Sequence, residues 1–362
     1  MTREVPLRLR PRLVGKPWGG TRLAGFGFGA PDGVEPWGEA HISHGCSGVV
    51  DSAGERSLAE LVGVEPERFV GERGRQAAGG ALFPLLIKLI DTAADLSIQI
   101  HPDDASARGV GEATGKIEAW HVLAAEPGAT VRVGLRSDAD PAAFAAAVRA
   151  GDPALVAMLR EIPVVPGDTI LLPAGSVHAI GRGILTYEIQ QPSDITYRLF
   201  DWGRVDAAGR SRQLHIEQGL AVLAPDVRPE PIAPVSLPAD VGQRDLLAAC
   251  RAFALERITL HVGEWISFNC EESPQVITCL GGAFRLAGQN RLLRLQAGES
   301  ALIPAGEIAV MDPIAPGIVL RGWVPDLERD VIRPARAGGA GAAAIAALAG
   351  PLDHLHAAQS AG

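Results

Sequence analysis

The sequence predicts a mainly β protein that contains two β-barrels and a few short helices. Many short Val/Ile/Leu-rich runs are separated by Gly, Pro, Asp and Ser, and one motif of turn, strand and corner occurs twice. The chain has 362 residues, of which 47% are hydrophobic and 21% charged. This length allows two packed cores, and the composition is typical of a globular protein rather than a disordered chain.

Charge and hydropathy exclude several classes of partner. The formal net charge is −9, which leaves no basic surface for nucleic acid and no cationic face for a membrane. No stretch of about 18 apolar residues occurs, and the arginine-rich start has no apolar core of signal-peptide length. We therefore expect cytoplasmic residence, no nucleic-acid partner and no membrane partner, while the oligomeric state stays open.

The first informative segment is residues 96–101, where apolar residues occupy every second position. Such alternation predicts a strand, because side chains in a strand point to opposite faces in turn. Ser97, Gln99 and His101 would then share one face. Two potential metal ligands, Gln99 and His101, are predicted to point the same way.

Two further segments offer groups of the same kind. Residues 115–120 read as a strand in which Lys116 and Glu118 share a face, so that a cation lies beside a carboxylate. Residues 167–178 read as a turn, a short apolar strand, a Pro/Gly corner and then His178.

Together these segments provide one amide oxygen, two imidazoles and one carboxylate. A single histidine on a strand is more often a hydrogen-bonded structural residue than a ligand. Three segments that each carry a suitable atom favour a metal, and they lack the cysteines of a closed structural site. An open position for water or substrate would remain, as in catalytic zinc sites.

Other features receive simpler interpretations. We expect helices at residues 139–150, at 57–62 and at 215–223, on composition. His41 and His44 are spaced like metal ligands, but no second segment supplies matching groups, so we expect no metal there.

Lys88 lies in an apolar run. We expect its ammonium to reach a surface carboxylate rather than to bind substrate.

An internal repeat suggests how the two barrels differ. Residues 167–175 are echoed by residues 298–306, and in this register His178 corresponds to Ala309. The second copy keeps the turn and strand signals but lacks the ligand. We therefore expect the second barrel to serve packing rather than chemistry.

The repeat also suggests domain boundaries. We predict a metal-binding catalytic barrel with helical additions at residues 1–228 and a degenerate barrel at 239–332, joined by the proline-rich stretch 227–238. An Ala/Gly-rich tail at 333–362, either mobile or a small helix, would follow.

Several long motifs occur in order along the chain. The main ones are FPLLIKLID (83–91), LSIQIHPDD (96–104), GKIEAW (115–120), PAGSVHAIG (173–181), EIQQPSD (188–194) and YRLFDWGR (197–204). They resemble the consecutive motifs of class I mannose-6-phosphate isomerases of the cupin superfamily, in the short bacterial form. The resemblance covers roughly residues 8–330, and it implies cupin-type, or jelly-roll, barrels.

The resemblance also implies residue roles. One zinc ion per chain would assist the interconversion of mannose 6-phosphate and fructose 6-phosphate, so the expected partner is a sugar phosphate. The zinc ligands that it implies are Gln99, His101, Glu118 and His178. The catalytic positions that it implies are Arg198, Lys116 and Asp194. The chain departs from the family pattern at His121, where tyrosine is common, and at residues 39–43, which only loosely match a tryptophan-containing segment.

The implied chemistry explains this set of groups. Interconversion moves a proton between C1 and C2 through an enediol, and the developing oxyanion needs positive charge, which zinc and Arg198 would supply. The base and the proton shuttle stay open among His101, Lys116 and Asp194.

Two alternatives use the same fold. A metal-dependent dioxygenase would use a two-histidine, one-carboxylate iron site, which overlaps these ligands. A non-catalytic module would bind the sugar phosphate without turnover. The presence of Lys116, Asp194 and Arg198 together weighs against both alternatives.

Overall fold

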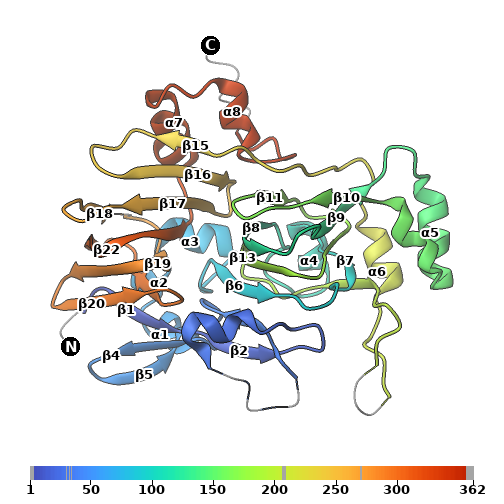
Figure 1. The fold of residues 1–362 in the computed structure, drawn as a ribbon, viewed down its shortest axis with the longest axis horizontal. Coiled ribbons are helices and arrows are strands. Elements are labelled where there is room, and N and C mark those ends of the chain that lie inside the picture. Colours follow the sequence, from blue (N-terminus) through green and yellow to red (C-terminus); the bar gives the residue numbers. More distant parts are fainter. Residues whose placement is uncertain are drawn as a thin grey trace.

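The computed structural model describes residues 4–29, 31, 33, 35–205, 209–269 and 271–355. Within these ranges the chain is mainly β, and its strands form three antiparallel sheets. The C-terminal strands lie on one side of the molecule and the strands from the middle of the chain lie on the other (Figure 1). The predicted fold class is confirmed.

One sheet, here called the first cavity sheet, separates the two sides. One face of β6 and β13 packs Ile87, Leu89 and Tyr187 into the main apolar core, which leaves the polar residues of these strands on the other face. In spatial order the strands are β11 (Thr169–Leu172), β8 (Glu118–Ala125), β13 (Ile184–Gln190), β6 (Leu86–Asp91), β3 (Trp37–His41) and β2 (Arg12–Gly15).

The second cavity sheet faces those polar residues. Its strand β7 pairs Gln99 with His178 on one side and with Arg198 on the other. Three residues predicted to act together are therefore neighbours in register. In spatial order the strands are β10 (Leu159–Pro163), β9 (Thr130–Leu135), β12 (His178–Ile180), β7 (Ile98–Ile100) and β14 (Tyr197–Phe200).

The long sheet holds most C-terminal strands and also N-terminal ones, because β1 pairs with both β21 and β4. Its path runs β15 (Val235–Leu237), β16 (Gln243–Ala249), β17 (Ala254–Leu260), β22 (Ile308–Trp323), β19 (Gln275–Gly288), β21 (Ser300–Ile303), β1 (Leu7–Arg10), β4 (Gly48–Asp51) and β5 (Gly54–Ser57). Beside this path, β18 (Ile266–Asn269) pairs with β22, and β20 (Arg291–Gln296) pairs with β19. The domain division at 1–228 and 239–332 stays a prediction.

The helices are short. They are α1 (Leu58–Val64), α2 (Pro66–Phe69), α3 (Gly71–Ala78), α4 (Asp104–Gly109), α5 (Pro141–Ala150), α6 (Ile216–Ala221), α7 (Arg333–Ala337) and α8 (Ala342–Ala347), with single turns η1 (Ala24–Phe28), η2 (Pro153–Met158) and η3 (Leu327–Ile332). The predicted helices at 139–150, 57–62 and 215–223 are confirmed as α5, α1 and α6. Ser57 starts α1 with a capping box to Glu60.

The described part of the C-terminal tail contains two short helices, α7 and α8. Ile345 and Leu348 of this region are buried in the main core, and the Ala249 N–H donates to the Leu348 carbonyl at 2.8 Å. Residues 333–355 therefore cover one end of the long sheet, while 356–362 lie outside the described residues.

A sharp corner positions His178 after β11. Gly175 has a φ of 82°, and a Cβ there would lie 2.8 Å from the carbonyl oxygen of Val222. Only glycine fits such a conformation and such a close approach. The corner thus brings the chain back across the cavity and places His178 at the start of β12.

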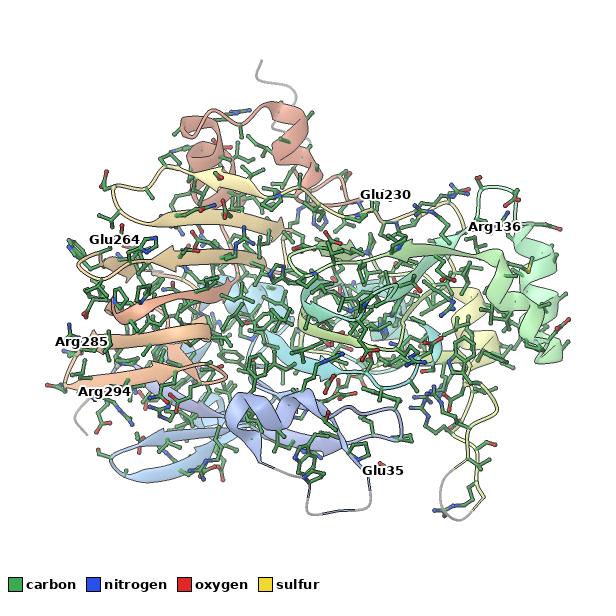
Figure 2. The ribbon with its side chains drawn as sticks, in the orientation of Figure 1. Glu35, Arg136, Glu230, Glu264, Arg285 and Arg294 are labelled. Atoms are coloured by element: carbon green, nitrogen blue, oxygen red, sulfur yellow. The ribbon has the colours of Figure 1, made fainter. Side chains whose placement is uncertain are left out.

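The outer surface carries charged side chains. Arg136, Glu230 and Arg285 are exposed, and in Figure 2 they lie at the periphery of the molecule. Among the described residues, no helix is both long enough and apolar enough to span a bilayer.

Candidate active site

A polar cavity of about 360 Å³ opens between the two cavity sheets. Such a volume suits a small ligand, and convergent polar groups would orient that ligand. Both acidic and basic side chains line the cavity. The charged residues that line it are Lys16, Glu39, Lys88, Lys116, Glu188, Asp194, Arg198 and Arg212.

A cross-strand row builds one wall of the cavity. His41 lies opposite Lys88, Lys88 opposite Glu188, and Glu188 opposite Trp120 in the register of the first cavity sheet. Directly opposed residues point to the same face of a sheet. Four strands therefore present polar or aromatic groups to the cavity, and this row is not visible in any one segment of the sequence.

His101, Glu118 and His178 converge on one point. Each is at most 2% exposed, and one ligand atom from each lies within 4.8 Å of the other two. Nε2 of His101 and Nε2 of His178 are each 3.4 Å from a different oxygen of Glu118. Two imidazoles thus flank one carboxylate.

Backbone contacts set the tautomers of both histidines. Nδ1 of His101 is 2.8 Å from the carbonyl oxygen of Ile195, and Nδ1 of His178 is 2.8 Å from that of Ser176. A ring nitrogen beside a carbonyl must donate, so Nε2 of each neutral ring keeps a lone pair that faces Glu118.

Burial keeps these rings neutral. It lowers the pKa of His178, and together with Lys116 it lowers the pKa of His101 to about 3. Burial alone would raise the pKa of Glu118, but Lys116 and His101 outweigh it and hold that pKa well below its usual value. The group therefore presents neutral imidazoles and a carboxylate, which are the forms that bind metals.

The amide of Gln99 completes the group. Its Nε2 lies 3.3 Å from Nε2 of His178, and its Oε1 accepts from the hydroxyl of Ser97 at 3.2 Å. A half-turn of the amide exchanges the two atoms with little change in shape and presents the oxygen to the cluster.

These residues fit a divalent metal. Both oxygens of Glu118 are buried without a hydrogen-bond partner of good geometry, although the ammonium of Lys116 is 2.8 Å from one of them. Ligand atoms about 2.0–2.1 Å from a tetrahedral zinc ion are roughly 3.3–3.4 Å apart. The contacts of His101 and His178 with Glu118 are close to this spacing, and the ligand atoms of all three residues lie within 4.8 Å of one another.

Lys116 lies just before β8, which begins at Glu118 rather than at residue 115 as predicted. Its ammonium is buried, and it lies 3.1 Å from Nε2 of His101. Lys116 therefore places a cation at the boundary between the metal-type cluster and the open cavity.

Lys88 reaches an exposed carboxylate, that of Asp194, as expected, but it does so from inside the cavity. It is 5% exposed and lines the cavity, where its ammonium lies 3.0 Å from Asp194 and 3.5 Å from Glu188. Although burial opposes a charged lysine, these carboxylates raise its pKa. The pairing also lowers the pKa of Asp194 to about 2, against the effect of burial.

Arg198 lies on the opposite wall, in the second cavity sheet. Its Nε donates to the hydroxyl of Ser97 at 3.3 Å, and its Nη1 donates to the carbonyl of Gln213 at 2.9 Å. Asp194 and Arg198, two of the catalytic positions that the resemblance implies, both line the cavity.

Sequence reasoning missed four charged cavity groups, which are Lys16, Glu39, Glu188 and Arg212. Glu188 is buried and accepts from Nε1 of Trp120 at 3.1 Å, and burial raises its pKa, as does the nearby Glu118. Arg212 also lines the cavity and pairs with Asp201. Alternation within 184–190 would have placed Glu188 with the polar face of its strand.

His121, the departure from the family pattern, lies outside the cavity lining. It is buried and lies 2.9 Å from the hydroxyl of Thr169, and burial lowers its pKa to about 4.

Comparisons with known proteins agree with this geometry. The family model for the catalytic domain of type I phosphomannose isomerase matches residues 7–118. Mannose-6-phosphate isomerase ManA of Bacillus subtilis is 32% identical over 319 residues, which are 84% of this chain and 95% of the relative. The probable mannose-6-phosphate isomerase GmuF of the same organism is 30% identical over 315 residues, or 84% and 96% of the two chains.

A solved structure shows the same architecture. The crystal structure of the mannose 6-phosphate isomerase from Bacillus subtilis superposes with a TM-score of 0.76 at 25% identity and covers 88% of this chain and 99% of that one. Similarity along nearly the whole length of these relatives leaves one conclusion. The chain belongs to the type I phosphomannose isomerase family.

Proposed function

We propose that this chain interconverts mannose 6-phosphate and fructose 6-phosphate, with one zinc ion bound in the cavity between its two cavity sheets. Relatives of that name match nearly end to end, which supports the reaction. The convergence of His101, Glu118 and His178, with Gln99 beside them, supports the ion. This convergence is the observation that carries the assignment of the site.

The reaction moves hydrogen within the sugar and needs no external oxidant. A base takes the proton from C2 of the open-chain aldose, and an enediol forms. A proton is returned to C1, while the hydroxyl proton on O2 is lost and O1 gains one. The cavity must therefore hold one proton-transfer group near the carbon atoms and another near the two oxygens.

Zinc, when bound, would polarise or orient the two sugar oxygens as a Lewis acid. Arg198 would add positive charge to the enediolate from the opposite wall, in a place where its guanidinium is already fixed by Ser97 and Gln213. Because the guanidinium of Arg198 is held before substrate arrives, little reorganisation is needed as negative charge develops on the sugar.

Three groups are suited to proton transfer. Lys116 is adjacent to the cluster and would shuttle a proton between O1 and O2. Asp194 stays ionised beside Lys88 and would act as a base. Glu188, with its raised pKa, is a third candidate on the same wall.

The phosphate would be bound by the cationic part of the wall. Lys88 is already paired with acids, whereas Arg212 also lines the cavity and would bind the phosphate. Arginine is well suited to phosphate oxygens because its donors form a rigid fork. We also propose cytoplasmic residence, where sugar phosphates occur.

The test is a coupled assay of fructose 6-phosphate formation from mannose 6-phosphate. The purified chain is stripped with a chelator, and activity is measured before and after addition of zinc, with manganese, cobalt and iron(II) in parallel. We expect activity to disappear and to return with one equivalent of zinc. Full turnover by the metal-free chain would contradict the metal assignment, and restoration by iron alone would contradict zinc.

A further inference from the structure

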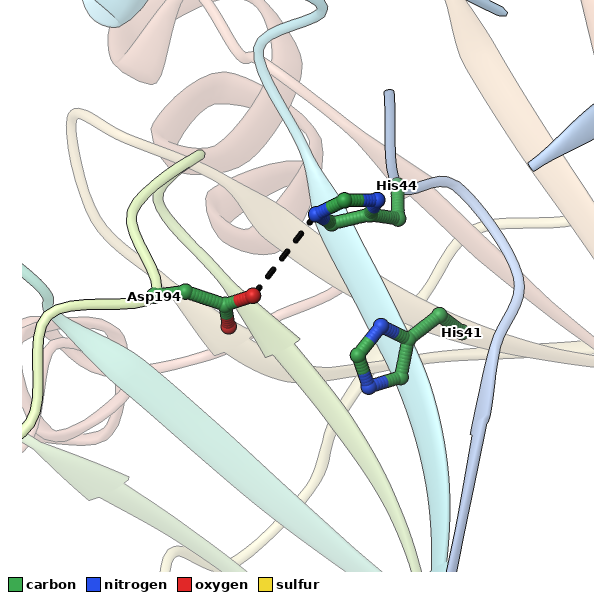
Figure 3. A group of neighbouring side chains, drawn as sticks. All are labelled: His41, His44 and Asp194. Carbon is green, nitrogen blue, oxygen red and sulfur yellow. Dashed lines mark ion pairs between the residues drawn. The ribbon is translucent and has the colours of Figure 1, made fainter. Parts of the chain in front are cut away.

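A second group of potential metal ligands lies in the wall of the cavity. His41 comes from the end of β3, His44 from the loop after it, and Asp194 from the segment before β14 (Figure 3). One ligand atom from each lies within 4.8 Å of the other two. The pair His44 Nε2 and Asp194 Oδ2 is 3.6 Å apart.

His41 supplies an independent sign of an unfilled contact. It is 5% exposed, and its Nε2 is 2.6 Å from a carboxylate oxygen of Glu39, so the ring proton lies on Nε2. Its Nδ1 is buried without a hydrogen-bond partner and points toward His44 and Asp194 in Figure 3. A lone pair is therefore aimed into the cluster.

We propose that His41, His44 and Asp194 form a second site for a divalent first-row transition metal, bound through Nδ1, Nε2 and Oδ2. Two imidazoles and a carboxylate suit zinc, cobalt, nickel or copper. The carboxylate of Glu39 behind His41 is the arrangement that orients many metal-bound histidines. The proposal does not depend on the isomerase activity.

Binding requires a small rearrangement. Ligands of a tetrahedral ion are roughly 3.3–3.4 Å apart, so the contact between His44 and Asp194 is nearly in place and the others must shorten. Nδ1 of His44 now accepts from the N–H of Cys46 at 3.0 Å. Ligation through Nε2 moves the ring proton to Nδ1 and ends this contact, and the exposed Cys46 can turn its N–H to water.

Neighbouring charges determine how strongly we expect the second site to bind a metal ion. The ammonium of Lys88 holds Oδ1 of Asp194 and leaves Oδ2 for the ion, but it repels a dication. The carboxylate of Glu39 offsets part of that repulsion. We therefore expect weaker binding here than at His101, Glu118 and His178, where the neighbouring amide of Gln99 offers a fourth ligand.

The position also provides access. A neighbouring, mainly apolar cavity of about 420 Å³ is lined by His44 and Asp194, whereas His41 and Asp194 line the polar cavity. The second site thus lies in the wall between two cavities. An ion can enter it without passing the first cluster.

The test is a titration of the metal-free full chain with Co²⁺, followed by calorimetry and by the visible absorption of bound cobalt. We expect the wild type to bind a weaker equivalent that His44→Phe abolishes. His261→Phe removes an exposed histidine elsewhere and is the matched control, which should titrate like the wild type. A titration unchanged by His44→Phe would overturn the proposal. That result is expected if the cluster holds water instead of a metal ion.

A second variant keeps the shape of the site. Glu39→Gln should weaken the second equivalent roughly 10–100-fold, as loss of an outer carboxylate does at other metal sites, and unchanged affinity would contradict the role of Nδ1 of His41. If the chain binds one ion and loses it with His44→Phe, this site stands while the zinc assignment of the proposed function fails. The two proposals are therefore separable.

Discussion

The two copies of the internal repeat share a backbone pattern but enclose different interiors. After β11 the chain turns at Gly175 and reaches His178, which faces Glu118 in a polar cavity. After β21 it turns at Gly306 and reaches Ala309, which is fully buried in an apolar core with Phe284 and Met311. One barrel therefore keeps space and charge for chemistry, while the other fills its interior for stability.

This contrast is sharpest at the metal-type cluster. His178→Ala should remove the bound metal and lower kcat/KM by more than about a hundredfold. A hundredfold is the upper end of the loss seen when a residue that only supports a metal ligand is replaced. Metal content and the coupled assay on one sample would show this. Ala309→His, the reciprocal change, should add neither metal nor activity, and a gain of metal there would contradict the contrast.

Two arginines, one from each barrel, test the same contrast between the polar and the apolar interior. Arg198→Met should lower kcat by about 10²–10³-fold, the loss seen when one donor to a developing oxyanion is removed. Arg321 of the long sheet stacks 4.1 Å from the ring of Trp323 and pairs with Glu256, so it is a matched control. Arg321→Met should leave kcat unchanged, and steady-state kinetics of both variants would show this. Equal losses in the two variants would count against a catalytic role for Arg198.

The apolar barrel should show the opposite response. Phe284 is fully buried, and Phe284→Ala should lower the free energy of unfolding by about 3–5 kcal/mol because it leaves a cavity. Denaturant titration measures this loss. Turnover per folded molecule should stay at the wild-type level, and a matching fall in kcat would mean that the second barrel shapes the active site.

The smallest effect concerns the ion pairs of Asp201, one of which holds the cavity residue Arg212. Burial favours the neutral acid, but hydrogen bonds from Arg212 and Arg204 hold the pKa of Asp201 below its usual value. Its ionised form therefore stabilises the fold above pH about 4, and that contribution is lost as the pH falls further toward the lowered pKa. The difference in Tm between wild type and Asp201→Asn should shrink over this range. A difference that is constant with pH would rule out the ion pair as its source.

Local patterns predicted much of the site. Alternation placed Gln99 and His101 on one face, and the repeat correctly distinguished His178 from Ala309. These inferences succeeded because strand periodicity and turn residues act over a few positions.

Features that depend on sheet register were missed. The place of Lys88 in the cavity wall could not be predicted because its partners Glu188 and Asp194 lie about a hundred positions later in the chain. His41 and His44 looked like an incomplete pair for the same reason, since Asp194 comes from a distant segment. Register between distant strands results from tertiary packing, which no short pattern contains.

Glu118→Gln tests the central claim most directly, because it removes one charge from the polar barrel and keeps the shape of the side chain. Zinc content and kcat for mannose 6-phosphate would be measured on the same folded sample. We predict loss of the ion and of turnover together, since Glu118 lies between both histidines. Wild-type turnover in a variant without bound metal would contradict the account.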